Sequence, residues 1–295
     1  MKKPPSGILL VDKPGGITSA LVVRRLARLL GKPKCGHLGT LDPMATGLLV
    51  VCVGNATKLV PYYGSGRKSY LAEVTFGTRT STDDAEGDVA ATAPLPEDLQ
   101  RSVDEALPRF VGTIKQVPPV FCAVKIKGRR LYKMARQGID VEVPERTVTI
   151  YDLSAATTEQ GTVALEVTCS AGTYIRSLAR DLGQACGSEA HLSSLRRTMS
   201  TPFSIEGALP YERLMEDSAG AAQAIKPVET WLPDLTVVQL SEQEEVDIRF
   251  GRAIERAVET DQDVVLISPS GKLVAIGDAQ KKPGWVRVKR LIDTH

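Results

Sequence analysis

Histidine and paired cysteines are scarce in this chain of 295 residues. There are three histidines, His37, His191 and the terminal His295, so the clusters of His, Cys and carboxylate that usually hold zinc or iron are missing. We therefore predict no metal site. The cysteines form no CxxC pair and lie mostly in apolar surroundings, which is typical of reduced core thiols in a cytosolic protein. They are Cys35, Cys52, Cys122, Cys169 and Cys186.

Long apolar segments are also absent, and no run reaches the length that spans a membrane. The N-terminus has Lys2 and Lys3 followed by Pro4-Pro5-Ser6-Gly7, in place of the apolar core of a secretion signal. We expect a cytoplasmic protein without a membrane anchor. The length is enough for one large domain, or for a large domain and a small one.

The net charge of +2 hides a strong segregation of charge along the chain. The segment 1–70 has eleven Lys and Arg residues and only two acids, Asp12 and Asp42. The segment 110–139 has seven basic residues and no acid. Between them, the segment 83–105 has eight acids and one Arg. Charge runs are often only solvated faces, but two basic segments around an acidic one favour a nucleic-acid partner, because cations neutralise phosphates. Composition does not separate RNA from DNA.

The most informative stretch is Gly36-His37-Leu38-Gly39-Thr40-Leu41-Asp42-Pro43-Met44-Ala45-Thr46-Gly47. It holds one carboxylate among small, turn-forming residues in a basic segment, so we expect Asp42 to be ionised and able to act as a nucleophile or a base. The alternative is a plain turn, since Asp before Pro commonly initiates one. The apolar run 48–53 that follows predicts a buried strand, with Asp42 shortly before its start.

Periodicity predicts an α+β fold with a largely antiparallel sheet and flanking helices. Helices are expected over 17–30, over 99–110, and from Ile175 to about Gly183. Strands are expected over 70–76, where Tyr70 shares a face with apolar neighbours, and over 163–169. After a boundary near Thr236, three short strands at 264–267, 273–276 and 285–288 predict a small β-barrel module. We therefore expect domains at 1–235 and 236–295.

Several motifs together resemble the TruB family of tRNA pseudouridine-55 synthases of the bacterial type. The resemblance covers roughly the first two hundred residues, and Thr201 departs from it because the family usually has Gly there. The C-terminal module resembles a PUA-type RNA-binding domain more weakly. The matching motifs, beside the Asp42 stretch, are Asp12-Lys13-Pro14, Gly16-Ile17-Thr18-Ser19, Ala56-Thr57-Lys58, Lys68-Ser69-Tyr70, Thr80 with Thr82-Asp83-Asp84 and Gly87, Gln116-Val117-Pro118-Pro119, Lys125 with Gly128, Tyr132 with Ala135-Arg136 and Gly138, Gly172-Thr173-Tyr174-Ile175-Arg176 and Leu195-Arg196-Arg197.

The resemblance implies a pseudouridine synthase fold and a set of site residues. Asp42 would be the catalytic carboxylate, paired with Arg176, and the uracil would be held by Tyr70, Tyr174 and Leu195. Two further residues would contact RNA: His37 would enter the T loop in place of the flipped base, and Lys58 would lie near the RNA backbone. The segment of roughly 110–146 would be an insertion that grips RNA.

The implied reaction converts uridine to pseudouridine in the T loop of tRNA, with no cofactor. It breaks the bond from N1 to C1′ and joins C5 to C1′ without redox change. The sequence leaves open whether Asp42 acts as a nucleophile or removes the C2′ proton. A glycosidase would normally show two cooperating carboxylates, and the Asp42 stretch has one.

Two alternatives remain at this point. The first is an RNA chaperone that remodels tRNA without needing catalysis, and the second is a synthase acting on ribosomal RNA in a larger complex. We expect tRNA, through its T stem-loop, to be the partner, with no membrane or protein partner and a monomeric state.

Overall fold

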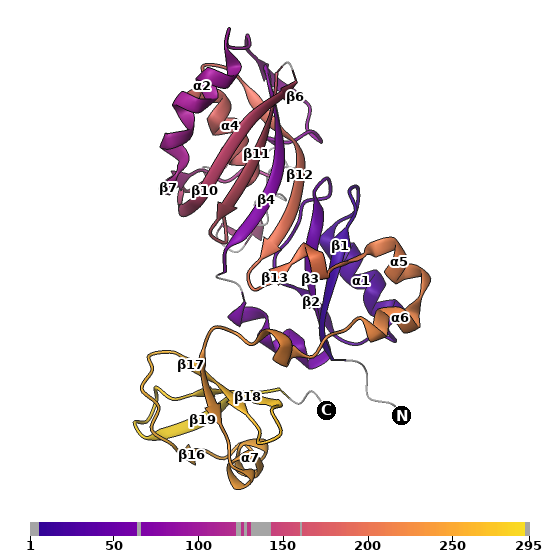
Figure 1. Cartoon of the computed structure of the whole chain (residues 1–295), viewed down its shortest axis with the longest axis vertical. Coiled ribbons are helices and arrows are strands. Elements are labelled where there is room, and N and C mark those ends of the chain that lie inside the picture. Colours follow the sequence, from indigo (N-terminus) through magenta and orange to yellow (C-terminus); the bar gives the residue numbers. More distant parts are fainter. Residues whose placement is uncertain are drawn as a thin grey trace. The chain divides into compact units, whose positions relative to one another are not determined.

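The computed structural model describes residues 6–63, 66–121, 125–126, 129–130, 143–159 and 161–292. The chain forms two compact units (Figure 1). The first comprises Met1–Asp42, Leu48–Gly64 and Pro202–His295, and the second comprises Pro43–Gly47 and Ser65–Thr201. The second unit therefore consists of two stretches of the chain, the five residues that follow Asp42 and the long segment from Ser65 to Thr201.

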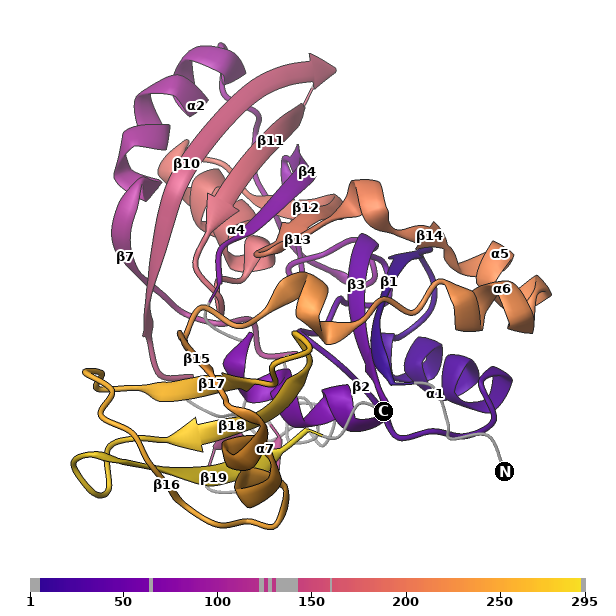
Figure 2. The same cartoon turned by 60° about the horizontal axis from the view of Figure 1, so that its bottom comes forward.

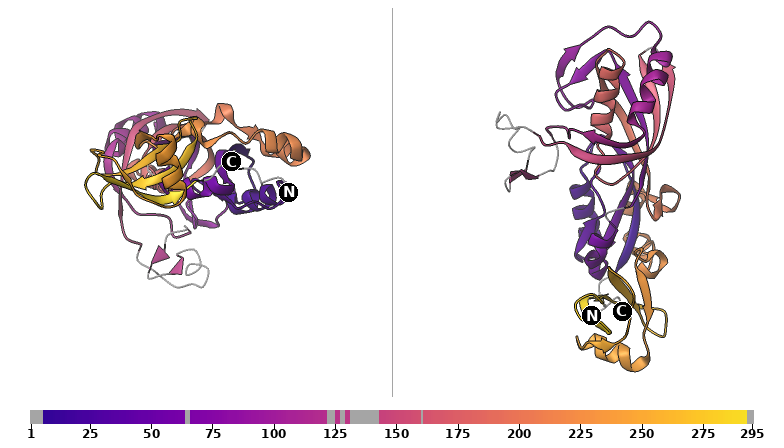
Figure 3. Two further views of the ribbon diagram at one scale, coloured as in Figure 1. Left: turned by 90° about the horizontal axis from the view of Figure 1, so that it is seen from below. Right: turned by 90° about the vertical axis from the view of Figure 1, so that its left-hand side faces the viewer.

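The second unit contains an antiparallel sheet in the order β12-β4-β11-β10-β7. Its long strand β10 is curved (Figures 2 and 3). Helix α4 packs against β12 and α2 against β10, and these two helices touch. The elements are β4 (Lys68–Phe76), β5 (Thr78–Thr80), β6 (Val89–Thr92), α2 (Leu99–Ala106), η2 (Leu107–Phe110), β7 (Gly112–Gln116), β8 (Lys125–Ile126), β9 (Arg129–Arg130), β10 (Arg146–Glu159), β11 (Thr162–Cys169), α4 (Ile175–Ala185) and β12 (Ala190–Ser200).

Strand β4 confirms the expected alternation. Tyr70, Ala72, Val74 and Phe76 are buried, whereas Leu71 is 44% exposed. Successive side chains of a strand point to opposite faces, so one face of β4 belongs to the core and carries Tyr70. The predicted alternation of β11 is also confirmed, with its apolar residues buried.

Two expected helices end differently from the prediction. The helix over 99–110 stops at Ala106 and continues as the 3-10 turn η2, which has a proline at its start and so lacks one amide donor. Helix α4 runs past Gly183 to Ala185. Gly183 lies inside the helix and does not end it. A Cβ at this position would come within 2.6 Å of the Cβ of Ala190, so glycine permits the close contact with β12.

The first unit is built from the N-terminal strands and the whole C-terminal third. Strands β14, β1 and β3 are neighbours in that order, and β2 pairs with β3. The predicted helix over 17–30 is confirmed as α1, which Thr18 caps through a hydrogen bond from the Leu21 amide. The elements before residue 235 are β1 (Gly7–Lys13), α1 (Ser19–Leu29), β2 (Cys35–His37), β3 (Thr46–Val53), η1 (Gly54–Tyr62), β13 (Phe203–Ser204), η3 (Ile205–Gly207), β14 (Leu209–Pro210), α5 (Tyr211–Glu216), α6 (Ser218–Gln223) and η4 (Val228–Trp231).

The C-terminal segment forms the predicted small β module. Its sheet has the order β15-β17-β18-β19-β16, is curved, and has α7 beside β18 and β19 (Figure 2). Strand β15 begins at Thr236, and a capping box of Ser241 and Glu244 starts α7. The elements are β15 (Thr236–Gln239), α7 (Glu242–Arg249), β16 (Ile254–Glu255), β17 (Asp263–Ile267), β18 (Leu273–Asp278) and β19 (Trp285–Leu291).

This module shares one apolar core with the N-terminal strands. Ile8 and Leu48 belong to the same buried cluster as Val265, Ile276 and Ile292. The boundary at residue 235 stays a prediction, but the shared core makes the C-terminal sheet part of the stability of the first unit. No helix among the described residues is long and apolar enough to cross a membrane.

The thiols of the described residues follow the expectation, and Cys122 lies outside those residues. Cys35, Cys52, Cys169 and Cys186 are unpaired in disulfides. Burial raises the pKa of Cys52 to about 12 and that of Cys169 to about 11, so both are neutral and unreactive at physiological pH.

We predict that Ile276→Ala destabilises the whole first unit, because this fully buried side chain lies in the shared core. The expected loss is about 2–5 kcal/mol in the free energy of unfolding, measured by urea titration. The control is Val237→Ala at a position that is 46% exposed, expected to change stability by less than about 0.5 kcal/mol. A variant in which only the C-terminal sheet melts, while the rest keeps its stability, would contradict the shared core.

Candidate active site

Two of the expected site residues lie on one face of the sheet of the second unit. Tyr70, on β4, stands opposite Val167 of β11 and Arg197 of β12. Leu195 stands opposite Ala72, two residues further along β4. Residues directly opposite in an antiparallel pair share a face, so Tyr70, Leu195 and Arg197 face the same way, all of them more than 90% buried.

Helix α4 brings the next two expected residues. Tyr174 is the N-cap residue, and Arg176 lies in the first turn. The Tyr174 amide donates to Gln116 Oε1 over 2.8 Å, and Gln116 Nε2 donates to the Tyr174 carbonyl over 3.1 Å. Gln116, at the end of β7, is 2% exposed, so a buried side-chain amide holds the start of the helix from both sides.

Arg176 is buried, and two other segments of the second unit bind its guanidinium. Nη1 donates to the Thr82 carbonyl over 3.0 Å and lies 3.3 Å from Asp84 Oδ2, while Nη2 donates to the Phe121 carbonyl over 3.1 Å. Asp84 is also buried. A charge removed from water in this way requires a partner of opposite sign, which Asp84 supplies.

The loop that carries Asp84 is built to hold this carboxylate. Asp84 Oδ1 accepts from Thr82 Oγ1 over 2.6 Å and from the Glu86 amide over 3.0 Å. A Cβ at Gly87 would lie 2.4 Å from Thr82 Oγ1, so glycine is required there. The sequence did not indicate this role of Asp84, and the available signal was its place between Thr82 and Gly87 in a turn-forming stretch.

A second arginine, one helical turn after Arg176, anchors the start of the insertion. Arg180 Nη1 lies 2.9 Å from Asp83 Oδ2, and Arg180 Nη2 donates to the Val117 carbonyl over 3.1 Å. Ser177 Oγ donates to the same carbonyl over 2.8 Å. Burial raises the pKa of Asp83, and the nearby Arg180 opposes that shift. Of the predicted insertion over 110–146, residues 122–124, 127–128 and 131–142 lie outside the described residues.

The chain is fixed on both sides of Asp42. On one side, Ser19 Oγ donates to the Leu41 carbonyl and accepts from the Leu41 amide, each over 2.9 Å. On the other side, Gly47 pairs with Arg197 of β12 at a φ of +94°, and a Cβ there would lie 2.3 Å from the Arg197 carbonyl oxygen. Asp42 is half-buried between these two attachments, and the residue after it begins the segment that belongs with Tyr70 and Leu195.

The other two expected RNA contacts lie in the first unit. His37, on β2, stands opposite Val51 of β3 and is half-buried. Lys58 lies in η1, and its Nζ donates to the Leu291 carbonyl of β19 over 2.7 Å. The ammonium group of Lys58 therefore binds the C-terminal module, a contact that the sequence did not indicate.

A titratable residue without a predicted role lies at the start of β4. Lys68 is half-buried and stands opposite Cys169 of β11 and Ser200 of β12. Burial and the nearby positive charge of Arg197 lower the pKa of Lys68 to about 8. Within the described part of the chain, no carboxylate pairs with its ammonium group.

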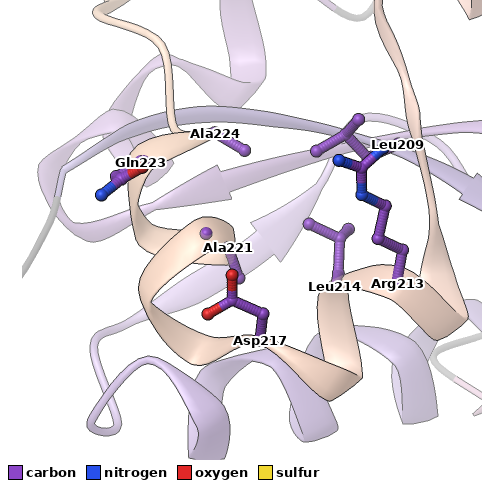
Figure 4. Close-up of a pocket in the computed structure, with 8 residues that line it drawn as sticks. Leu209, Arg213, Leu214, Asp217, Ala221, Gln223 and Ala224 are labelled. Carbon is purple, nitrogen blue, oxygen red and sulfur yellow. The ribbon is translucent and has the colours of Figure 1, made fainter.

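A pocket of the first unit lies elsewhere, between α5 and α6 (Figure 4). It has a volume of about 390 Å³, and Arg213, Leu214 and Asp217 are among its lining residues. Asp217 Oδ1 accepts from the Ala219 amide over 3.0 Å, which caps α6. None of the expected site residues lines this pocket.

We predict that Lys68→Met stabilises the protein at neutral pH. The pKa of Lys68 is about 8 in the fold and higher in the unfolded chain, so the unfolded state binds more protons between pH 8 and about 10.5, and stability rises with pH across that window. Below pH 8 the cost of the buried charge is present in full. Lys68→Met should therefore raise the free energy of unfolding by about 1–3 kcal/mol at pH 7.

The measurement is denaturant unfolding of both proteins at pH 7 and at pH 10. The gain from Lys68→Met should shrink at the higher pH, whereas Lys68→Arg, which stays charged, should show no such gain at either pH. An equal effect of Lys68→Met at both pH values would show that packing, not charge, sets the difference.

Comparisons with known proteins show what the chain is similar to. Residues 27–175 match the model of the TruB family pseudouridylate synthase N-terminal domain, and residues 176–233 match that of the tRNA pseudouridylate synthase B C-terminal domain. The tRNA pseudouridine synthase B of Halalkalibacterium halodurans is 41% identical over 97% of both chains.

Two solved structures share the fold over most of the chain. A chain in a crystal structure of a Cbf5-Nop10-Gar1 complex is 27% identical, with a TM-score of 0.74 over 97% of this chain and 85% of that one. A chain in a structure of an H/ACA RNP bound to a substrate RNA containing 2′-deoxyuridine is 25% identical, with a TM-score of 0.73 over the same shares.

Proposed function

The chain belongs to the TruB family of pseudouridylate synthases, and we infer that it is an isomerase that converts uridine to pseudouridine in tRNA. We propose further that the target is the uridine at position 55 in the T loop and that Asp42 is the catalytic carboxylate. The observation that carries the proposal is the way the chain is held on both sides of Asp42, by the hydrogen bonds of Ser19 to Leu41 before it and by the pairing of Gly47 with β12 after it.

The reaction needs one ionised carboxylate and a dry, flat pocket. The bond between N1 and C1′ breaks, C5 joins C1′, the C5 proton leaves, and N1 gains a proton, so atoms balance without a cofactor. Two routes use the same carboxylate, since Asp42 either attacks as a nucleophile or accepts the C2′ proton. The buried ring of Tyr70, the ring of Tyr174 and the side chain of Leu195 would supply apolar walls around the detached uracil.

Arg176 would place a positive charge beside this carboxylate without moving during the reaction. Its contacts with Thr82, Asp84 and Phe121 fix the guanidinium before substrate arrives, and a preorganised charge needs no reorganisation in the transition state. Asp84 is the second acid of the region. Its oxygens are engaged by Arg176, Thr82 and the Glu86 amide, so it is a poor candidate for the proton donor of a glycosidase.

The proposed RNA contacts follow from the same assignment. A target uridine inside a folded loop must leave its stack, which costs a few kcal/mol. His37 would fill the vacated space, and Lys58, whose ammonium group donates to the Leu291 carbonyl, would lie near the RNA backbone. We propose the T stem-loop as the recognised element and a monomer as the acting form. Catalysis, in contrast to simple RNA remodelling, gives a reason for a buried and fixed guanidinium at Arg176.

Asp42→Asn tests the catalytic assignment directly, because the change is nearly isosteric and removes only the charge. Turnover on unmodified tRNA should fall by more than about 1,000-fold, while the dissociation constant for tRNA stays within a factor of about three. Asp104→Asn, on the exposed side of α2, is the matched control and should keep full activity. Substantial turnover by purified Asp42→Asn would move the catalytic role to another residue.

A further inference from the structure

Lys68 and Arg197 bring two positive charges to the face of the sheet that carries Tyr70. Lys68 precedes Tyr70 by two residues on β4, so both side chains point to the same face. Arg197 stands directly opposite Tyr70 on β12. The register thus groups one aromatic side chain and two cations at the same end of β4.

Placing the Lys68 ammonium group in a half-buried position near Arg197 costs stability, as its lowered pKa of about 8 indicates. Like charges repel, and a half-buried ammonium loses part of its hydration. The groups that act on Lys68 are Arg197, which has the same sign, and Cys169 of β11, whose pKa burial raises to about 11. Cys169 is therefore neutral over the physiological range. In the described residues, the Lys68 ammonium has neither a hydrogen-bond acceptor nor an acid within ion-pair distance.

An anionic ligand would offset that cost, and the proposed substrate brings one. A nucleotide that leaves its stack carries a phosphate on each side of its ribose. If its base packs on Tyr70, a flanking phosphate comes within reach of a long side chain on the same face. Lysine, with a flexible stem and three donors, binds phosphate as a point charge.

We propose that Lys68 binds a backbone phosphate of the substrate RNA next to the target uridine, with Arg197 behind it raising the local positive potential. The proposal rests on the proposed function, because it takes the occupant of this face to be RNA. It assigns a role to the first residue of the Lys68-Ser69-Tyr70 motif.

The test measures RNA binding by the full chain in the Asp42→Asn background, which prevents turnover. Dissociation constants for a T stem-loop hairpin are measured for three proteins: Asp42→Asn alone, and Asp42→Asn combined with Lys68→Met or with Lys68→Arg. Each is measured across salt concentrations and from pH 7 to pH 9.5. Arg101→Met is the matched control, since it removes one positive charge from an exposed helix residue that already pairs with Glu105. Lys68→Met should fold, because it removes a buried charge.

We expect Lys68→Met to weaken binding by about tenfold at pH 7. The slope of log Kd against log salt concentration should fall by about one, which corresponds to the loss of one phosphate contact. Wild-type affinity should fall as pH rises past about 8, where Lys68 loses its proton, and bound phosphate should shift this loss to higher pH. Lys68→Arg should keep affinity at both ends of the pH range. Arg101→Met should change neither affinity nor slope.

Two results would overturn the proposal. If Lys68→Met lowers turnover in the Asp42 protein but leaves affinity and salt slope unchanged, Lys68 acts on the reacting base and not on phosphate. If Arg101→Met weakens binding as much as Lys68→Met does, only the net charge matters. Failure of the proposed function is a separate outcome, because it would show as absent pseudouridine in tRNA treated with the wild-type protein, whatever the binding comparison gives.

Discussion

The buried guanidinium of Arg176 is the interaction on which the arrangement of the second unit depends. A charge with 4% exposure is tolerated only where several acceptors surround it, and here they come from the loop that holds Thr82 and Asp84 and from the root of the insertion at Phe121. Two segments distant in sequence are thereby tied to the first turn of α4. Replacing Arg176 by an apolar residue would leave Asp84 buried and uncompensated.

The same helix also fixes the pieces next to the proposed site. Gln116 holds the backbone of Tyr174, and Arg180 with Ser177 holds Val117. The root of the insertion and the start of α4 therefore form one hydrogen-bonded block. If the insertion grips RNA, as we propose, it would act through this root on the helix that carries Tyr174 and Arg176.

The sequence was enough to predict the elements that depend on local pattern. Alternation identified the buried face of β4 and β11, and capping signals located α1, because these depend on neighbours within a few residues. Asp84, Gln116 and Lys68 received no role, since a charged or amide residue in sequence looks solvated until distant pairing shows what surrounds it. The Asp83–Arg180 pair belongs to the same class, because its partners lie on a loop and a helix far apart in the chain.

The C-terminal third shows the same limit on a larger scale. Strands β17, β18 and β19 were predictable from short apolar runs between turns. Strands β15 and β16 were not predicted, and neither was the core that the module shares with Ile8 and Leu48. Lys58 illustrates the consequence: the motif suggested a contact with RNA, and the structure shows a hydrogen bond to the Leu291 carbonyl. The C-terminal sheet is thus a structural support of η1, in addition to any role in RNA binding.

The most direct test of the central claim is to map pseudouridine, nucleotide by nucleotide, in unmodified tRNA and in an isolated T stem-loop incubated with the pure protein. The account predicts one new pseudouridine, at the same T-loop uridine in both RNAs, because the contacts proposed for Tyr70, Tyr174 and His37 all lie within that arm. Modification at a different uridine, or a hairpin that binds without ever being modified, would contradict it.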